Sequence, residues 1–222
     1  MTAYRHARLA VIHAYDHPIV RAYCWGRFWI LRQRFLDEIG QYLPERGRVL
    51  DLGCGFGLFS LYYASVHPAL AVEGLDRNAR RIAMAREAAR RLGLPNVHYE
   101  VGDVMDFRAG ERFDSVYMLD IVHHISEEAV RPLLEQVATT LPEGGRLLVK
   151  DVDRQPAYKR WFTHALDKVM DPATPVRYWG AEELHALLEN VGFDVYRHLM
   201  VDILPYPHVL YVCTKRGANS SQ

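Results

Sequence analysis

The sequence predicts an α/β domain whose mainly parallel, seven-stranded sheet has helices on both faces and ends in a C-terminal antiparallel hairpin. Two observations predict this fold. From Arg48 onward, short apolar runs typical of strands buried on both faces alternate with helical patterns, as in parallel sheets joined by crossover helices. The last two extended runs are separated by only five residues. That spacing allows a hairpin, whereas a parallel crossover needs a dozen residues or more.

The first expected element is a long amphipathic helix over about residues 19–42. Its apolar side chains recur at spacings of three and four, and Trp25, Trp29 and Leu36 widen the apolar stripe. Either this helix is sandwiched between the sheet and another helix, or its second apolar face closes over a ligand. The two interpretations are compatible.

The remaining elements follow from periodicity and from capping residues. Helices should begin after Ser126 and end at Gly93 and Gly192. Strands are expected at 49–52, 70–75, 97–101, 115–122 and 147–152, and the hairpin at 193–203 and 209–214. Helices are expected at 58–66, 78–92, 127–141, 158–170 and 181–191.

Composition excludes several classes of protein. The 27 basic and 27 acidic side chains give no net charge, which argues against a general nucleic-acid binder because that class needs a basic excess. Half of the residues are hydrophobic and about a quarter are charged, as in ordinary soluble proteins. Three scattered cysteines and the lack of a leader-like apolar stretch predict a cytoplasmic protein. We expect a monomer or a homodimer.

The most informative stretch is the glycine-rich segment of residues 49–57, VLDLGCGFG, which follows a strand pattern and precedes a helix. Asp51 comes before Gly53, Gly55 and Gly57. Glycines here allow a sharp turn and a close approach of the backbone to a ligand. The third glycine stands one place too early for a dinucleotide fingerprint, and a carboxylate at position 51 suits a cation better than a pyrophosphate. A dinucleotide site and a purely structural turn remain alternatives.

These residues resemble motif I of the class I S-adenosylmethionine (SAM) dependent methyltransferases, in which an acidic residue precedes three alternating glycines. The matching motifs span about residues 45–155. The resemblance implies that the three glycines lie against the methionine part of SAM and that Asp51 helps to fix its ammonium group. S-adenosyl-L-methionine is therefore the expected cofactor, and the fold should be that of this family.

Later strand ends supply the other cofactor contacts that the resemblance implies. Asp76 should accept hydrogen bonds from the ribose hydroxyls, unless it is a solvated turn residue, and Arg77 and Asn78 flank that site. Asn78 is equally suited to cap a helix. Asp103 should meet the adenine amine, with Val104 beside the ring. The expected cofactor set is Asp51, Gly53, Gly55, Gly57, Asp76, Arg77, Asp103, Val104 and Leu119.

The segment of residues 113–125 resembles the fourth-strand motif of the same family. Many small-molecule methyltransferases have a histidine at its end, whereas enzymes that methylate base or amide nitrogens have Asn or Asp followed by Pro-Pro-Tyr or Pro-Pro-Phe, which is absent here. His124 and His123 are therefore the expected general bases. The resemblance favours His124, because the recurrent histidine of the family usually directly precedes an aliphatic residue, here Ile125. Alternatively, both only pack or form hydrogen bonds near SAM.

Aromatic side chains outside the motifs suggest the acceptor. Tyr23, Trp25, Trp29, Trp161 and Tyr178 are the expected acceptor contacts, although aromatic residues at helical spacing are more often core. A small, apolar or aromatic acceptor is expected, with O-methylation favoured over C- or N-methylation. No metal site is expected; a site at Asp120, Asp151 and Asp153 is a minor alternative.

We interpret residues 1–222 as one methyltransferase domain. Within it, 1–44 form a helical cap, 45–153 the SAM-binding core, 154–180 an acceptor-side helical insertion, and 181–216 the last helix and hairpin. A lipid, quinone or carrier-bound acceptor is an alternative, as is a catalytically inactive SAM-binding partner subunit. Contact with a membrane surface through the helix at 19–42 is a minor alternative, and no nucleic-acid partner is expected.

Overall fold

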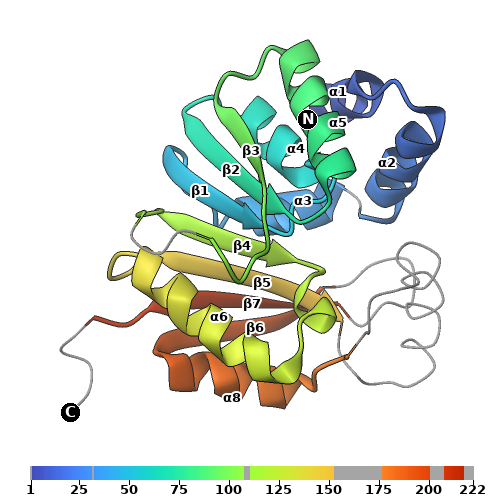
Figure 1. Ribbon diagram of the computed structural model, residues 1–222. Helices are drawn as coiled ribbons and strands as arrows, with labels where there is room; N and C mark the ends of the chain where they lie inside the picture. The colour runs from blue at the N-terminus through green and yellow to red at the C-terminus, as the bar shows by residue number, and fades with distance from the viewer. Residues whose placement is uncertain (1, 32, 108–110, 153–176, 201–207, 218–222) are drawn as a thin grey trace. The chain divides into compact units, whose positions relative to one another are not determined.

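The computed structural model describes residues 2–31, 33–107, 111–152, 177–200 and 208–217. Seven described strands form one mixed sheet in the order β3-β2-β1-β4-β5-β7-β6, which confirms the predicted fold class (Figure 1). The chain divides into two compact units, Met1–Arg108 with Phe113–Ser115, and Ala109–Arg112 with Val116–Gln222. The helix expected at 158–170, with Trp161, lies outside the described residues.

Three parallel strands form the sheet of the first unit: β1 (Gly47–Leu52), β2 (Leu70–Asp76) and β3 (Val97–Val101). Val49 pairs with Val72, which in turn pairs with Val97. Because all three strands run in the same direction, their carboxyl ends meet at one edge of the sheet. The apolar centres of the strands are buried, as the sequence predicts.

Two crossover helices of the first unit begin and end within one residue of their predicted bounds. Helix α4 (Leu58–Val66) and helix α5 (Ala79–Leu92) pack against β2 and β3 (Figure 1). Asn78 caps α5, since its side chain accepts hydrogen bonds from two backbone N–H groups in the first turn. Gly93 ends α5 with a left-handed φ of 63°.

The N-terminal region differs from the prediction. The single helix expected over 19–42 is wrong, because α2 (Pro18–Ile30) and α3 (Gln33–Gly40) are separate helices. The break is at Leu31, whose φ of −87° and ψ of 84° are not helical. The apolar spacing continues across the break, with Phe28, Leu31 and Phe35 all buried, so periodicity could not reveal it. Helix α1 (Thr2–Ala14), which was not predicted, packs against α4 and α5.

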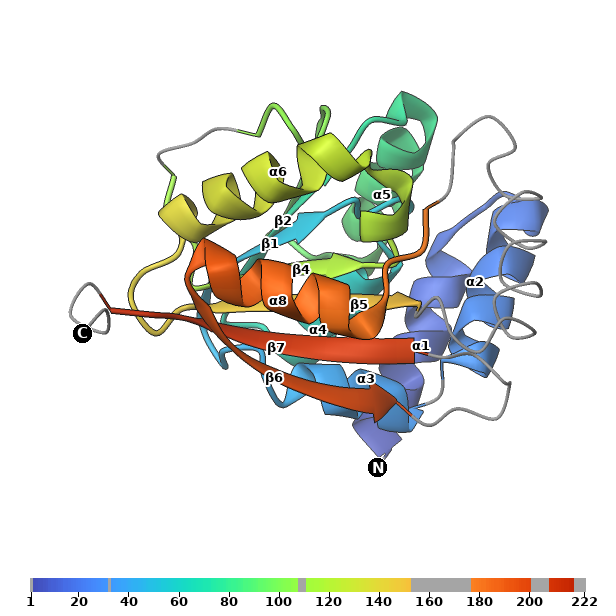
Figure 2. The ribbon, with the colours of Figure 1, turned by 90° about the horizontal axis from the view of Figure 1, so that it is seen from below.

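The second unit carries the predicted hairpin. Strand β7 (His208–Lys215) pairs antiparallel with both β5 (Arg146–Val152) and β6 (Phe193–Met200). Helix α8 (Ala181–Val191) packs against β6 and β7, beside α6 (Glu127–Thr140), and ends at Gly192 as predicted (Figure 2). Strand β4 (Ser115–Leu119) is shorter than expected. It stops because Asp120 takes a left-handed φ of 59° and Val122–His124 form a 3₁₀ turn, η1.

Among the described residues, no helix combines the length and the apolar character that a membrane span requires.

Candidate active site

The first unit brings the expected cofactor residues to neighbouring strand ends. The glycine loop, residues 53–57, follows β1, and the register places Leu52 beside Leu75. Asp76 is the last residue of β2 and pairs with Val101, the last residue of β3. Gly102 and Asp103 come next. Residues expected at the methionine, ribose and adenine parts of SAM therefore leave adjacent strands.

The glycine loop has the conformation that its sequence requires. Gly53, Gly55 and Gly57 have left-handed φ values of 79°, 56° and 76°. A Cβ at Gly57 would overlap the Tyr99 side chain, whereas a Cβ at Gly55 would meet nothing within 4 Å. The loop therefore packs tightly at its far end and leaves backbone accessible at Gly55, as a ligand cradle must.

Two buried carboxylates hold this loop in place. Asp51 is 3 % exposed and accepts a hydrogen bond from the Ser60 hydroxyl. The two oxygens of Asp76 accept from the backbone N–H of Gly55 at 2.9 Å and of Asn78 at 2.8 Å. Asp76 thus ties the glycine loop to the start of α5. Each carboxylate oxygen has a second lone pair, so the same group can still accept from ribose hydroxyls.

The remaining expected cofactor residues differ in exposure. Asp103 is exposed, and its Oδ1 accepts from the Met105 N–H at 2.9 Å, which fixes the carboxylate in a local turn. Val104 is buried and Arg77 is exposed. Burial raises the pKa of the Cys54 thiol, the residue between the first two glycines, so it stays neutral. An open glycine cradle with acidic groups fits a cationic, ribose-bearing cofactor such as SAM.

The second unit places both expected histidines in or beside the turn after β4. His123 is 2 % exposed, and its Nδ1 lies 2.5 Å from Oδ1 of Asp151. The other oxygen of Asp151 accepts from the His123 backbone N–H at 3.0 Å. The His124 ring is half-buried with its centroid 4.1 Å from that of His123, and the Tyr178 ring stacks on His123 at 5.6 Å. Asp151 therefore fixes the His123 ring.

A second charged contact lies beside this one. Lys150, which is fully buried, pairs with Asp120. Sequence reasoning missed Lys150 and considered Asp151 only as a metal ligand. The signal was available, because two adjacent charged residues in an otherwise apolar, buried strand need partners nearby.

In the part of the chain that the structure describes, no three His, Cys, Asp or Glu side chains are arranged to hold a metal ion. Asp120 and Asp151 pair with Lys150 and His123. Asp153 lies outside the described residues.

The expected acceptor residues are found in different surroundings. Tyr23 packs against Phe56 of the glycine loop, with ring centroids 5.5 Å apart. Trp25 and Trp29 lie on the outward face of α2 and are 58 % and 53 % exposed. Leu119, an expected cofactor contact, is buried at the end of β4, directly before Asp120. Tyr178 lies against His123, and Trp161 is not among the described residues.

This sheet order, with a glycine loop and acidic strand ends, defines the class I methyltransferases. A methyltransferase-domain family model matches residues 25–198, and the chain belongs to this family, whose methyl donor is SAM.

A ubiquinone biosynthesis O-methyltransferase of Cereibacter sphaeroides is 30 % identical over 72 % of this chain and 66 % of its own length. The chain thus spans just under two thirds of that relative. Among solved structures, YcgJ of Bacillus subtilis has a TM-score of 0.67 at 18 % identity, covering 84 % of this chain and 100 % of its own. A magnesium protoporphyrin IX methyltransferase of Synechocystis, solved with S-adenosylhomocysteine (SAH), has a TM-score of 0.65 at 19 % identity, covering 82 % and 83 %. These two structures share the fold.

Proposed function

We propose that the protein transfers a methyl group from SAM to a hydroxyl group of a small, apolar or aromatic acceptor. The observation that carries the hydroxyl assignment is the buried contact of 2.5 Å between His123 and Asp151. A hydroxyl must lose its proton when it is methylated, and an imidazole held by a carboxylate is suited to take that proton near neutral pH.

Bound SAM supplies an electrophilic methyl group on a sulfonium centre. The glycine loop, Asp51 and Asp76 bind and orient the donor, and we assign the adenine contact to Asp103 and Val104. A buried, apolar surround helps such displacement because it excludes water and fixes the line of attack.

Asp151 would hold His123 with Nδ1 protonated, which leaves Nε2 as the acceptor of the hydroxyl proton. In the reaction the acceptor oxygen forms a bond to the methyl carbon while the carbon–sulfur bond breaks. The hydroxyl proton passes to the imidazole, and the sulfur leaves as the neutral thioether SAH. His124, which the family resemblance favours, lies against His123 and is here the alternative base.

Calorimetry with SAH, followed by a screen with labelled SAM over phenols, catechols and quinols, tests this proposal. We expect SAH binding and transfer to at least one aromatic hydroxyl. His123→Gln should lower kcat about 100-fold or more while the SAH Kd changes little, since general-base catalysis contributes about 10²–10⁴-fold. His124→Gln, measured alongside it, distinguishes the two histidines.

His185→Gln is the matched control, because His185 is a half-buried histidine on α8 whose contact is Glu189 at 3.5 Å. It should leave kcat unchanged. Full activity in His123→Gln, His124→Gln and the double variant would refute the base assignment. Absence of SAH binding at millimolar ligand would refute the whole proposal.

A quinone-type acceptor is the second candidate. It is supported by the name of the Cereibacter relative and by the two exposed tryptophans of α2. Transfer to short-chain quinols but not to simple phenols would favour it. If the acceptor is carrier-bound, or if the protein is a catalytically inactive SAM-binding subunit, the protein would instead bind SAH and methylate none of the small molecules in the screen.

A further inference from the structure

Two tyrosine hydroxyls hold consecutive carbonyl groups of the glycine loop. Tyr15 donates to the carbonyl of Phe56 at 2.7 Å, and Tyr99 donates to the carbonyl of Gly57 at 3.2 Å. Both tyrosines are less than 5 % exposed. Tyr99 comes from β3, next to the cofactor motifs. Tyr15 comes from the turn between α1 and α2, which no motif includes.

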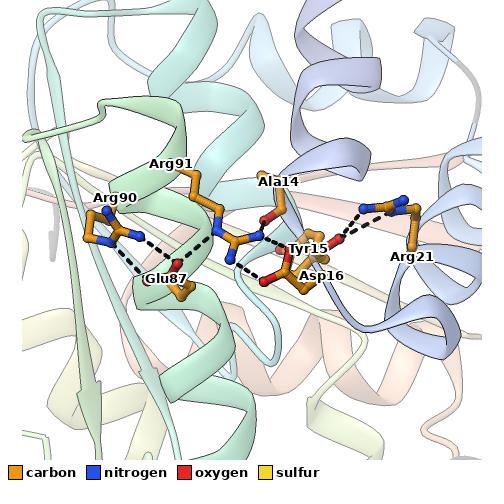
Figure 3. A network of polar contacts seen from close by, with 7 residues as sticks. All are labelled: Ala14, Tyr15, Asp16, Arg21, Glu87, Arg90 and Arg91. Atoms are coloured by element: carbon orange, nitrogen blue, oxygen red, sulfur yellow. Dashed lines mark hydrogen bonds and ion pairs between the residues drawn. The ribbon is translucent and has the colours of Figure 1, made fainter.

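The turn that carries Tyr15 is itself fixed by arginines on both sides (Figure 3). Arg21 of α2 donates two hydrogen bonds to the Tyr15 carbonyl, at 3.1 and 2.8 Å. Arg91 of α5 pairs with Asp16, and Glu87 accepts from Arg91 at 2.7 Å on the same helix. The main chain around Tyr15 is therefore anchored to both α2 and α5.

The side chain of Phe56 is also held from this region. The Tyr23 ring of α2 lies 5.5 Å from the Phe56 ring, and the Arg81 guanidinium of α5 lies 5.5 Å from the same ring. Phe56 stands between Gly55 and Gly57, so both of its flanking positions have wide backbone freedom.

We propose that Tyr15 is a positioning residue for cofactor binding. Its hydroxyl fixes the peptide group between Phe56 and Gly57, and thereby keeps Gly55 in the geometry in which its N–H meets Asp76. This inference rests on the proposed function only in that the glycine loop holds SAM. It assigns to the turn at residues 14–16 a part in the cofactor site that the methyltransferase motifs do not contain.

The physical basis is the freedom of the loop. Three glycines at left-handed φ have many alternative conformations, and every contact that selects one of them lowers the ordering cost of binding. When only a fraction of the loop population is competent, the apparent Kd rises by the inverse of that fraction. Loss of the Tyr15 hydroxyl should therefore weaken cofactor binding without removing any group that touches the acceptor.

Tyr15→Phe tests this directly, because it keeps the buried ring and removes only the hydrogen bond. We expect the SAH Kd from calorimetry to rise about fivefold, the equivalent of one ordinary hydrogen bond. In steady-state assays, KM for SAM should rise while kcat at saturating SAM is retained. Arg21→Met, which releases the Tyr15 carbonyl, should shift the Kd in the same direction by a smaller factor.

Tyr63→Phe is the matched control. The Tyr63 hydroxyl is equally buried and also donates to a backbone carbonyl, that of Leu36 at 3.1 Å, but this bond joins α4 to α3. It should lower the melting temperature about as much as Tyr15→Phe and leave the SAH Kd unchanged.

An SAH Kd that is unchanged in both Tyr15→Phe and Arg21→Met, or that rises equally in Tyr63→Phe, would overturn the inference. Failure of the proposed function looks different. A wild-type protein that binds SAH and methylates no acceptor would refute the transfer reaction while the Tyr15 comparison still gives its answer. A wild-type protein that does not bind SAH would refute both.

Discussion

Asp76 shows how one side chain can support the fold and also belong to the proposed cofactor site. Its two oxygens accept from the N–H groups of Gly55 and Asn78, which belong to the glycine loop and to the cap of α5. The bonds fix the loop while the carboxylate keeps the lone pairs that a ribose would need. The residue that the motif marks as a ligand contact is therefore also a structural anchor, and its substitution has two separable effects.

We predict that Asp76→Asn weakens SAH binding at least tenfold and lowers the free energy of unfolding by about 1–3 kcal/mol. An amide offers only one acceptor oxygen, so one of the two part-buried N–H groups would face the amide NH₂ and lose its partner. Calorimetry with SAH and guanidinium unfolding measure the two effects.

Asp114→Asn is its control. Asp114 likewise accepts from a backbone N–H, that of Arg48 at 2.7 Å, but it is exposed and lies at the opposite end of β1. It should leave the SAH Kd unchanged. Equal SAH affinity in wild type and Asp76→Asn would contradict the role given to Asp76.

For single residues, the sequence was most informative directly after a predicted strand, where an acidic residue or a glycine stands. The places of Asp51, Asp76 and the glycines at strand ends could be predicted because each follows a short apolar run in the sequence. Tyr15 could not, because it meets Phe56 across 41 positions of sequence and belongs to a turn with no pattern. Lys150 and its partner Asp120 are 30 positions apart. Such pairs depend on tertiary packing, which a single sequence does not encode locally.

At the scale of elements, periodicity predicted the strands and crossover helices and failed at the N-terminus. All seven described strands begin within two residues of their predicted positions because their apolar runs are short and end at glycine, proline or charged residues. The break between α2 and α3 has no glycine or proline at Leu31 to mark it. Both sides bury the same stripe, so the bend is decided by what they pack against.

For two helix glycines, Gly93 and Gly26, we predict opposite effects of alanine substitution on the free energy of unfolding. Gly93 ends α5 at a φ of 63°, where any Cβ is strained. We expect Gly93→Ala to lower the free energy of unfolding by about 1 kcal/mol. Gly26 lies within α2, and a Cβ there would meet nothing within 4 Å. Gly26→Ala should stabilise the protein by about 0.5–1 kcal/mol.

Thermal and guanidinium unfolding of both variants against wild type measure these changes. A stabilising Gly93→Ala would show that the end of α5 is not held in the left-handed conformation.

At the scale of the whole molecule, the core contains several cysteine thiols and tyrosine hydroxyls, which burial keeps in their neutral form. Burial raises the pKa of Cys24 to about 12 and raises that of Cys213 as well. Burial likewise raises the pKa values of Tyr15, Tyr63 and Tyr99 well above that of an exposed phenol. All three cysteines are buried thiols, which fits a chain with no disulfide framework.

These groups make the fold sensitive to alkaline pH. In the unfolded chain a cysteine loses its proton near pH 8.5, whereas folded Cys24 keeps it up to about pH 12. Above pH 8.5 the unfolded state therefore binds fewer protons than the folded state, so the free energy of unfolding falls as pH rises, up to about pH 12. The loss is at most about 1.4 kcal/mol per pH unit for each such group.

We predict that the free energy of unfolding falls between pH 8 and pH 10 and that Cys24→Ala reduces this fall by about 2 kcal/mol. The comparison uses the difference between two pH values within each variant, so the cost of the small cavity left by alanine cancels. Guanidinium unfolding at both pH values, with a reductant present, measures it. If Cys24→Ala shows the same fall as wild type, the Cys24 thiol must titrate in the folded protein much as it does in the unfolded chain, and its core site would be accessible to water.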